Sequence, residues 1–168
     1  MKLHLQPITL TKHNALLQLM QRIYPPAYQH LWINNDCNWY INSQYNLKQL
    51  TTELQDKNAN YYFVEYNNKT IGILRLVHQK SLATTKLHRL YLDQDYQGLG
   101  LGKQLMQLSY DFARANQSKS IWLEAMDTQL QALQFYKQCG FKIVDSYALD
   151  FDLILGQFNG MHKMSRQL

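Results

Sequence analysis

Hydrophobic positions along the chain repeat with two different periods, and the period changes from one segment to the next. Alternation of apolar and polar residues, or a short run rich in β-branched and aromatic residues, indicates a β-strand, whereas a 3.6-residue period indicates an amphipathic helix. The predicted strands cover residues 3–7, 61–66, 71–77, 87–92, 120–126, 141–149 and 161–165. Four helices are predicted: one after Thr11, one after Asn46, one from near Lys103, and one over residues 129–139.

Capping and breaking residues set the expected ends of the helices. Thr11 is a candidate N-cap of the first helix, and Pro25 and Pro26 are expected to end it because proline has no backbone N–H. Asn46 is a candidate N-cap of the second helix, with Gln49 at the capping-box position. The expected buried stripe of the third helix consists of Leu105, Met106, Leu108, Phe112 and Ala113.

Turn residues connect the remaining elements. Asn67, Asn68 and Lys69 lie between two β-rich runs and predict a hairpin, and Gly140 follows the last helix as its C-terminal cap. The chain has 168 residues and no linker, repeat or low-complexity block. We therefore expect a single domain over residues 1–168.

The stretch 87–103 carries the clearest functional signal. An apolar strand is followed by a polar turn, by the alternating glycines Gly98, Gly100 and Gly102, and by the start of a helix near Lys103. Backbone N–H groups exposed by such glycines, together with the positive dipole end of the helix, form a site suited to a pyrophosphate. The glycine spacing excludes a Walker loop, the dinucleotide-binding fingerprint and the glycine loop of kinases.

Composition narrows the classes of function. The formal net charge is +5 and the 17 Lys and Arg residues are spread along the chain, which favours attraction to anions over a nucleic-acid-binding surface. Cys37 and Cys139 are the only cysteines and make no disulfide framework, and the histidines show no metal-ligand spacing, so no metal site is expected. No apolar stretch approaches the length of a membrane span. We therefore expect a cytoplasmic protein without membrane or nucleic-acid partners.

Three motifs resemble those of one protein family. Gln97-x-x-Gly100-x-Gly102 resembles the signature that opens the main helix in the GNAT acyltransferase superfamily. Residues 120–127 are similar to the family's next strand, and residues 132–141 are similar to its A-x-x-F-Y-x-x-x-G-F helix end. The resemblance implies a mixed α/β fold with a central, mostly antiparallel twisted sheet of six to seven strands, flanked by about four helices.

The resemblance also implies acetyl-CoA as co-substrate. The pyrophosphate would bind the glycine loop, and the pantetheine arm would bind backbone groups of the preceding strand, which in the family splays away from its neighbour. Gln129 stands where family members commonly have an asparagine, so its amide is one methylene further from the backbone. The implied cofactor-binding residues are Leu90, Tyr91, Leu92, Gln97, Gly98, Leu99, Gly100, Leu101, Gly102, Lys103, Gln129 and Tyr136.

Acyl transfer to an amine needs an acid for the departing thiolate and a base for the amine. Tyr136 matches the family tyrosine near the sulfur, and it can donate a proton because the ordinary pKa of tyrosine is about 10. The candidates for the base are His88, where family members often have glutamate, Glu124 on the next strand, and a relay through water. Alternation places His88 on the same face as Leu90 and Leu92 unless a β-bulge intervenes.

The sequence specifies the acceptor amine less closely than it specifies the co-substrate. The aromatic residues Tyr24, Tyr28, Trp32, Trp39, Tyr40 and Tyr45 could hold a cationic amine or simply cover the core. The runs R-L-Y-L at 89–92, I-W-L-E at 121–124 and F-Y-K-Q-C-G-F at 135–141 resemble the bacterial Pai-type polyamine acetyltransferases. This resemblance implies a small-molecule amine such as spermidine as acceptor. The alternatives are a protein N-terminus or lysine as acceptor and, from another class, a non-catalytic acetyl-CoA-binding regulatory module; a homodimer is a further possibility. Carboxylates that could face the acceptor are Asp36, Glu53, Asp56, Asp150 and Asp152.

Overall fold

A computed structural model describes residues 3–168, which form one seven-stranded sheet and five α-helices. The strands follow the order β1-β2-β3-β4-β5-β7-β6, and every neighbouring pair is antiparallel except β4 and β5. The strands are β1 (Leu3–Pro7), β2 (Ala59–Tyr66), β3 (Lys69–Gln79), β4 (Thr84–Leu92), β5 (Ser120–Met126), β6 (Lys142–Ala148) and β7 (Gly160–Gln167). The helices are α1 (His13–Tyr28), α2 (Asn38–Gln44), α3 (Leu47–Gln55), α4 (Leu101–Ala115) and α5 (Leu130–Gln138). The expected mixed α/β fold with a mostly antiparallel sheet is confirmed.

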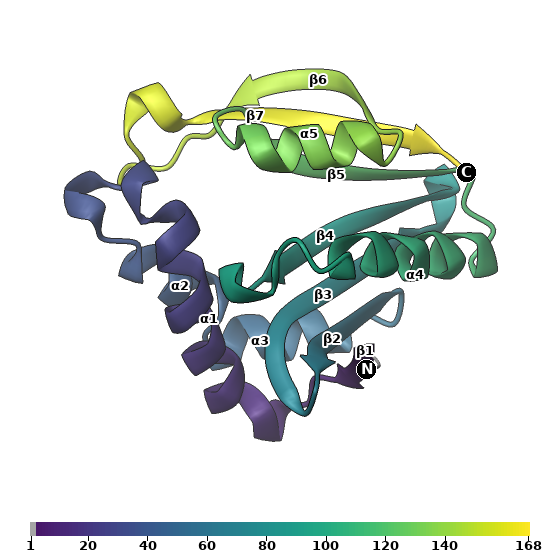
Figure 1. The fold of residues 1–168 in the computed structure, drawn as a ribbon, viewed down its shortest axis with the longest axis horizontal. Helices are drawn as coiled ribbons and strands as arrows, with labels where there is room; N and C mark the ends of the chain where they lie inside the picture. Colours follow the sequence, from purple (N-terminus) through teal and green to yellow (C-terminus); the bar gives the residue numbers. More distant parts are fainter. Residues whose placement is uncertain (1–2) are drawn as a thin grey trace.

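Helices cover both faces of the sheet and enclose two hydrophobic clusters. The cluster on one face joins buried residues of α1, α2 and α3 to β2 and β3, whereas the cluster on the other face joins α4 and α5 to β3, β4, β5 and β7. In Figure 1, α4 and α5 run along the same side of the sheet, and α1 lies across its other part. Leu87, Leu90 and Leu92 of β4 pack in the cluster of α4 and α5, and Tyr91 packs in the other cluster, so this strand contacts both.

The sheet opens between β4 and β5. These strands pair in parallel over three residues only, Thr84 to Lys86 against Ser120 to Trp122. Beyond that point they diverge, as Figure 1 shows, and the rest of β4, residues 87–92, pairs only with β3. One edge of β4 is therefore free of strand partners, which is the splay that the family resemblance implies.

A β-bulge interrupts β4 inside this free segment. Arg75 of β3 pairs with Arg89 and Leu76 pairs with Leu87, so His88 is one extra residue on β4. A bulge lets two consecutive side chains face the same side as the single residue opposite them. His88 and Arg89 therefore both lie on the side of Arg75, and the placement of His88 on the face of Leu90 and Leu92, expected from strict alternation, does not hold.

Several local signals give the expected structure. Asn67 and Asn68 adopt φ values of 50° and 60° and connect β2 to β3 as a hairpin. The Asn46 side chain accepts a hydrogen bond of 2.8 Å from the backbone N–H of Gln49, which caps α3. The Gln49 side chain does not return the capping-box bond and instead donates to Glu53.

Three expectations about the helices are wrong. Pro25 and Pro26 lie inside α1, because the Gln29 N–H donates to the Pro25 carbonyl and closes one more turn after the prolines. Thr11 lies in a short 3₁₀ turn before α1 and does not cap it. Leu108 is 39% exposed, because the buried stripe of α4 passes through Leu101, Leu105, Met106, Ser109, Tyr110 and Ala113.

Helix α2 is an addition to the expected order of elements. Its sequence, NWYINSQ, has neither a cap nor a clear period, and only Ile41 is fully buried within it. It forms in the segment that sequence analysis singled out for its aromatic residues, and it packs against α1. Tertiary packing, rather than local propensity, accounts for this helix.

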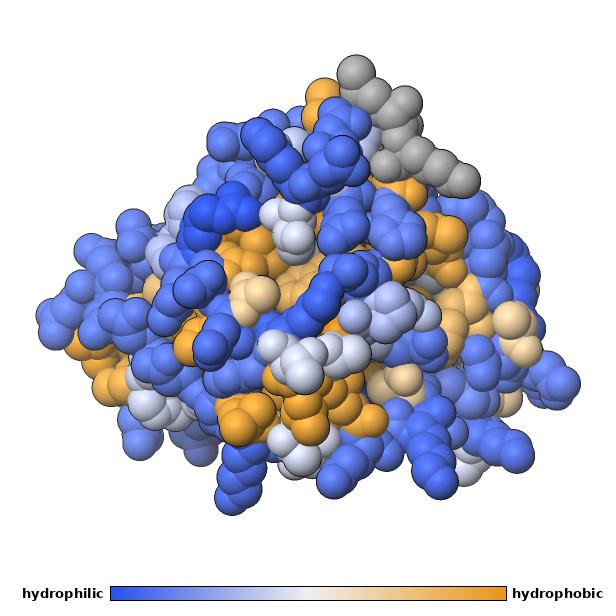
Figure 2. All heavy atoms as spheres, turned by 90° about the horizontal axis from the view of Figure 1, so that it is seen from below, coloured by the Kyte–Doolittle hydropathy of each residue, from blue (hydrophilic) through white to orange (hydrophobic). Residues whose placement is uncertain are grey.

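The face of the molecule seen from below is mostly polar. Hydrophilic side chains cover most of this face, and hydrophobic atoms show as patches between them (Figure 2). None of the helices in residues 3–168 is long and apolar enough to cross a membrane.

A buried ion pair joins α3 to the bulged part of β4. The Arg89 Nη1 donates to the Glu53 Oε2 over 2.5 Å, and these residues are 5% and 6% exposed. The Arg89 guanidinium also lies over the rings of Tyr45 and Tyr61, at 4.9 Å and 5.6 Å from their centroids. The desolvation cost of both charges is offset only while each keeps its partner.

Replacing Glu53 by glutamine leaves Arg89 buried without a counter-ion. We expect Glu53→Gln to lower the free energy of unfolding by about 3 kcal/mol, measured by urea denaturation. Asp56→Asn is the matched control: the Asp56 side chain is 35% exposed and lies 3.9 Å from Arg75, so its loss should cost less than about 1 kcal/mol. Equal losses in the two variants would contradict the dominance of the buried pair.

Candidate functional site

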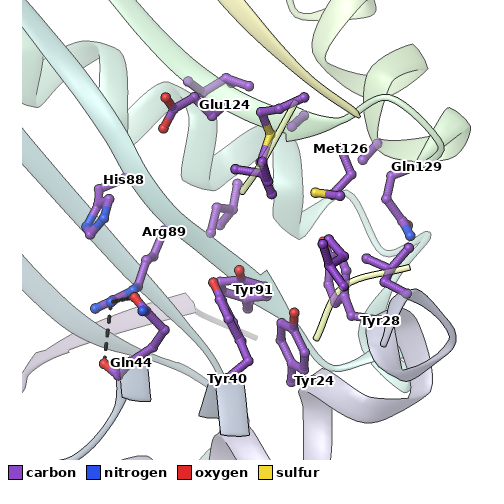
Figure 3. Close-up of a pocket in the computed structure, with 18 of the residues that line it drawn as sticks. Tyr24, Tyr28, Tyr40, Gln44, His88, Arg89, Tyr91, Glu124, Met126 and Gln129 are labelled. Carbon is purple, nitrogen blue, oxygen red and sulfur yellow. Dashed lines mark hydrogen bonds between the residues drawn. The ribbon is translucent and has the colours of Figure 1, made fainter. Parts of the chain in front are cut away.

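A cavity of about 220 Å³ lies between β4 and β5, beyond the point where the two strands separate. Side chains of α1, α2, β4, β5, α5 and the loop before β7 line it (Figure 3). The sequence-predicted site residues that line it are His88, Leu90, Tyr91, Glu124, Gln129 and Tyr136. Leu92 and the loop residues 97–103 lie outside the lining. All three catalytic candidates therefore share one cavity.

Aromatic rings form one wall of this cavity. Tyr24 stacks on Tyr28 and on Tyr40, with ring centroids 4.8 Å and 5.0 Å apart, and Tyr91 meets Tyr28 edge-on. Burial raises the pKa of Tyr24, Tyr28 and Tyr40, so their hydroxyls remain protonated. Of the aromatic residues singled out in the sequence, Tyr24, Tyr28, Trp32 and Tyr40 line the cavity, whereas Trp39 and Tyr45 do not.

The free edge of β4 presents backbone groups to the gap. The Asp93 N–H donates to the Ile71 carbonyl of β3, and hydrogen bonding alternates along an antiparallel strand. The N–H groups of Leu90 and Leu92 therefore point away from β3, towards the side from which β5 has diverged. This backbone can bind an extended ligand and polarise a carbonyl, as an oxyanion hole does.

The glycine loop leads from β4 to α4. Gly98 and Gly100 have φ values of 77° and 76°, and no atom lies within 4 Å of a Cβ added to either of them. The first hydrogen bond of α4 runs from Gln104 to Gly100, so none of the N–H groups of residues 98–103 has a backbone acceptor within the described chain. These free N–H groups precede and open a 15-residue helix, which makes the loop a site for an anion.

Gly102 serves a different purpose from the other two glycines. It lies within α4, and a Cβ at this position would come within 3.1 Å of the ring of Phe135. Its missing side chain therefore lets α5 approach α4, rather than opening the anion site as the sequence suggested. The backbone N–H of Gly102 is still one of the N–H groups of residues 98–103 that have no backbone acceptor within the described chain.

Tyr136 extends from α5 into the cavity. Its ring packs against Phe135 and Phe141, with centroids 5.4 Å and 6.0 Å away. Burial, together with neighbouring Tyr28 and Cys139, raises the pKa of Tyr136 well above its ordinary value. The hydroxyl is therefore protonated at neutral pH and available as a donor.

Gln129 joins the two sides of the gap. It immediately precedes α5, and its Nε2 donates over 3.3 Å to the carbonyl of Ala27 near the end of α1. The longer glutamine side chain thus reaches across to α1 while it still lines the cavity. Figure 3 shows it beside Met126, on the side of the cavity opposite His88.

His88 lies in a strongly basic environment. Its Nδ1 lies 2.7 Å from the Nη1 of Arg75. Burial, followed by the charges of Arg89, Arg75 and Lys86, lowers the pKa of His88 to about 3. The imidazole is therefore neutral at neutral pH and has little tendency to take up a proton.

Glu124 lines the cavity from β5 and is already bound on both oxygens. The Lys86 Nζ lies 2.6 Å from its Oε2, and the Tyr147 hydroxyl donates to its Oε1 over 2.5 Å. Although burial raises the pKa of Glu124, the hydrogen bonds from Lys86 and Tyr147 lower it below its ordinary value. Glu124 is the one carboxylate in the lining, and it is ionised.

Other predicted carboxylates do not reach the cavity. Glu53 is buried in its ion pair, whereas Asp36, Asp150 and Asp152 are exposed and outside the lining. Among the described residues, no group of three or more His, Cys, Asp or Glu side chains could hold a metal ion. The cavity is therefore aromatic rather than acidic.

Sequence analysis did not identify two polar residues of the lining, Arg89 and Gln44. The Arg89 Nη2 lies 3.3 Å from the Gln44 Oε1, the contact drawn in Figure 3. Arg89 could have been noticed as a lone charge inside an apolar strand. Gln44 belongs to the unexpected helix α2 and carried no such signal.

Comparison with known proteins gives one family. The model of the acetyltransferase (GNAT) family matches residues 13–141. The fold is similar to PaiA N-acetyltransferase from Thermoplasma acidophilum in complex with coenzyme A, with a TM-score of 0.80, 16% identity and 100% of each chain covered. The fold is also similar to a mutant of the spermidine N-acetyltransferase SpeG from Vibrio cholerae, with a TM-score of 0.72, 16% identity, and 98% of this chain and 93% of that chain covered. A third similar structure is an acetyltransferase from Thermus thermophilus, with a TM-score of 0.74, 19% identity, and 100% of this chain and 98% of that chain covered.

At these identities the solved structures establish the fold alone. The family match covers more than half of the chain and includes β4, the glycine loop, β5 and α5, which are the elements that build the opening. By this match the chain belongs to the acetyltransferase (GNAT) family and is an acetyl-CoA-dependent N-acetyltransferase.

Proposed function

We propose that this protein transfers the acetyl group of acetyl-CoA directly to a primary amine of a small molecule, within a ternary complex. The observation that carries the proposal is the cavity in the splay of β4 and β5, which has free backbone N–H groups on one edge and the protonated Tyr136 on the other. Two ligands can meet there without a covalent enzyme intermediate, since the lining contains no cysteine or serine.

Acetyl-CoA would extend from the glycine loop along the free edge of β4. The pyrophosphate is assigned to the N–H groups of residues 98–103, with Gln97 and Lys103 at the ends of the loop. The pantetheine arm is assigned to the backbone of Leu90 and Leu92, whose side chains pack in the core. In this pose a β4 N–H polarises the thioester carbonyl, and Tyr136 protonates the departing thiolate.

The amine must lose a proton before or during attack. His88 is poorly suited to receive it, because its Nδ1 is bound to Arg75 and its pKa is far below neutral. Glu124 is ionised, faces the cavity and is weakly basic. We assign proton removal to water in the cavity, with Glu124 as the nearest carboxylate to receive it.

The names of the similar structures make polyamines the first acceptors to test, since they include a spermidine acetyltransferase. Ammonium groups can lie against the tyrosine wall through cation–π contacts. The amine of a peptide is the alternative acceptor. A purely regulatory acetyl-CoA-binding module is less consistent with a protonated tyrosine in the same cavity as the free backbone edge.

Removing the Tyr136 hydroxyl should slow the chemical step. We expect Tyr136→Phe to reduce kcat by roughly 100-fold with little change in KM for acetyl-CoA, since the ring still packs. Thiol release from acetyl-CoA with saturating amine measures this. Tyr62→Phe is the matched control, because that hydroxyl bonds Asn60 on β2, outside the cavity lining. An unchanged kcat in Tyr136→Phe would exclude the acid role.

Filling the loop at Gly100 should abolish cofactor binding. We expect Gly100→Val to weaken acetyl-CoA affinity by at least about 100-fold, because the side chain occupies the anion site and resists the positive φ. Calorimetric titration with acetyl-CoA measures this. Gly100→Asn separates the two causes, since asparagine tolerates this backbone but still fills the site. Normal affinity in both variants would contradict the loop assignment; Gly156→Val, at an open position of ordinary φ, is the control.

A further inference from the structure

The hydrogen bond between Arg75 and His88 fixes which ring nitrogen carries the proton. The Arg75 Nη1 lies 2.7 Å from the His88 Nδ1. A guanidinium has five donors and no acceptor, and it stays protonated, so the Nδ1 must accept. A neutral imidazole that accepts at Nδ1 carries its single proton on Nε2. His88 is therefore locked as a donor at Nε2.

The charged groups around the ring hold it in that state. Arg75 reaches it from β3, and Arg89 and Lys86 flank it on β4. The acidic groups on this side belong to α3: Glu53 bonds Arg89, and Asp56 lies 3.9 Å from Arg75. Lys86 is paired with Glu124 of β5. The basic groups that act on His88 all oppose a second proton on its ring.

The Nε2 donor has no partner in residues 3–168, where the only hydrogen bond of the ring is the one at Nδ1. The ring lines the cavity, and Arg89 lines it from the adjacent position. The Arg89 guanidinium meets Gln44 only at 3.3 Å and 3.5 Å, so part of its donor capacity is weakly used. Figure 3 shows His88, Arg89 and Gln44 together on one side of the cavity and the tyrosines beside them.

We propose that His88 is a specificity residue whose Nε2–H, supported by Arg89, binds a carbonyl or carboxylate oxygen carried by the acceptor next to its amine. This inference rests on the proposed acetylation of a small-molecule amine and narrows the acceptor to an amino acid or an amino-acid amide. The tyrosine wall then holds the body of the acceptor, and aromatic or cationic side chains suit it best.

A polyamine fits this arrangement poorly. Protonated polyamines offer only donors, so they would leave the His88 and Arg89 donors unpaired inside the cavity, which costs binding energy. Several ammonium groups would also need several carboxylates. The lining supplies Glu124 alone, and both of its oxygens already accept hydrogen bonds.

The first test compares acceptors that differ in a single group, with wild-type protein and thiol release as the readout. The acceptors are 2-phenylethylamine, phenylalaninamide, phenylalanine and spermidine. We expect kcat/KM for phenylalaninamide or phenylalanine to exceed that for 2-phenylethylamine by about tenfold or more, since a hydrogen bond to a buried donor is gained. The amide and the acid together distinguish a carbonyl from a carboxylate.

The outcomes separate this inference from the proposed function. Turnover of spermidine or 2-phenylethylamine as fast as that of the amino-acid-like pair would overturn the inference and leave amine acetylation standing. If none of the four acceptors causes thiol release, in protein that binds acetyl-CoA, the result would contradict both the proposed amine acetylation and this inference.

The second test removes the donor. His88→Phe should erase the preference for phenylalaninamide over 2-phenylethylamine, mainly through KM, whereas His88→Gln keeps a donor and should retain part of the preference. His4→Phe is the control, because His4 is exposed on β1 and outside the cavity lining. An unchanged preference in His88→Phe would overturn the role of His88.

The third test needs no variant. Nitrogen-15 NMR of histidine-labelled wild-type protein should show one neutral histidine protonated at Nε2, whose resonance shifts when phenylalaninamide is added to the complex with CoA. His88→Gln would serve only to assign the signal. A His88 resonance protonated at Nδ1, or one that titrates near the ordinary histidine pKa of about 6.5, would contradict the locked donor.

Discussion

The short parallel contact between β4 and β5 is the constraint on which the rest of the site depends. Three residue pairs hold the two strands together, and then each strand follows a different neighbour, β3 on one side and β7 on the other. Because one edge of the β4 backbone has no strand partner beyond Lys86, the polar groups on that edge must be satisfied by a ligand or by water. The cavity, the free N–H groups of Leu90 and Leu92, and the position of Tyr136 all follow from that early separation.

The two ligands proposed for this gap have different requirements. Two parts of the chain would meet them separately: the loop after β4 and the bulge in the middle of β4. The glycine loop that leaves the strand offers backbone groups, which bind a phosphate whatever the neighbouring side chains are. The bulge inside the strand offers side chains, because it turns His88 and Arg89 to the side of Arg75. The buried Glu53 balances this basic group, so under the proposed role of His88 one network would serve both stability and acceptor recognition.

Sequence analysis predicted the parts of the structure that rest on local chemistry. The hairpin at Asn67 and Asn68, the Asn46 cap, the seven strands and the glycine loop all follow from short-range rules. It could not predict what depends on contacts between distant segments: α2, the extra turn of α1 beyond Pro26, and the reach of Gln129 to Ala27. The bulge at His88 belongs with these, since only the pairing of β4 with β3 reveals the extra residue.

Under the proposed role of His88, that extra residue would make acceptor recognition separable from cofactor binding in evolution. A bulge is an insertion of one amino acid, and losing one codon at His88 would restore regular pairing between Arg75 and the strand opposite it. Such a deletion would remove the donor at the cavity while Leu90, Leu92 and the glycine loop kept their order along the chain. Under the same proposal, a change in strand length alone would alter which amines are acetylated, while the glycine loop stayed the same.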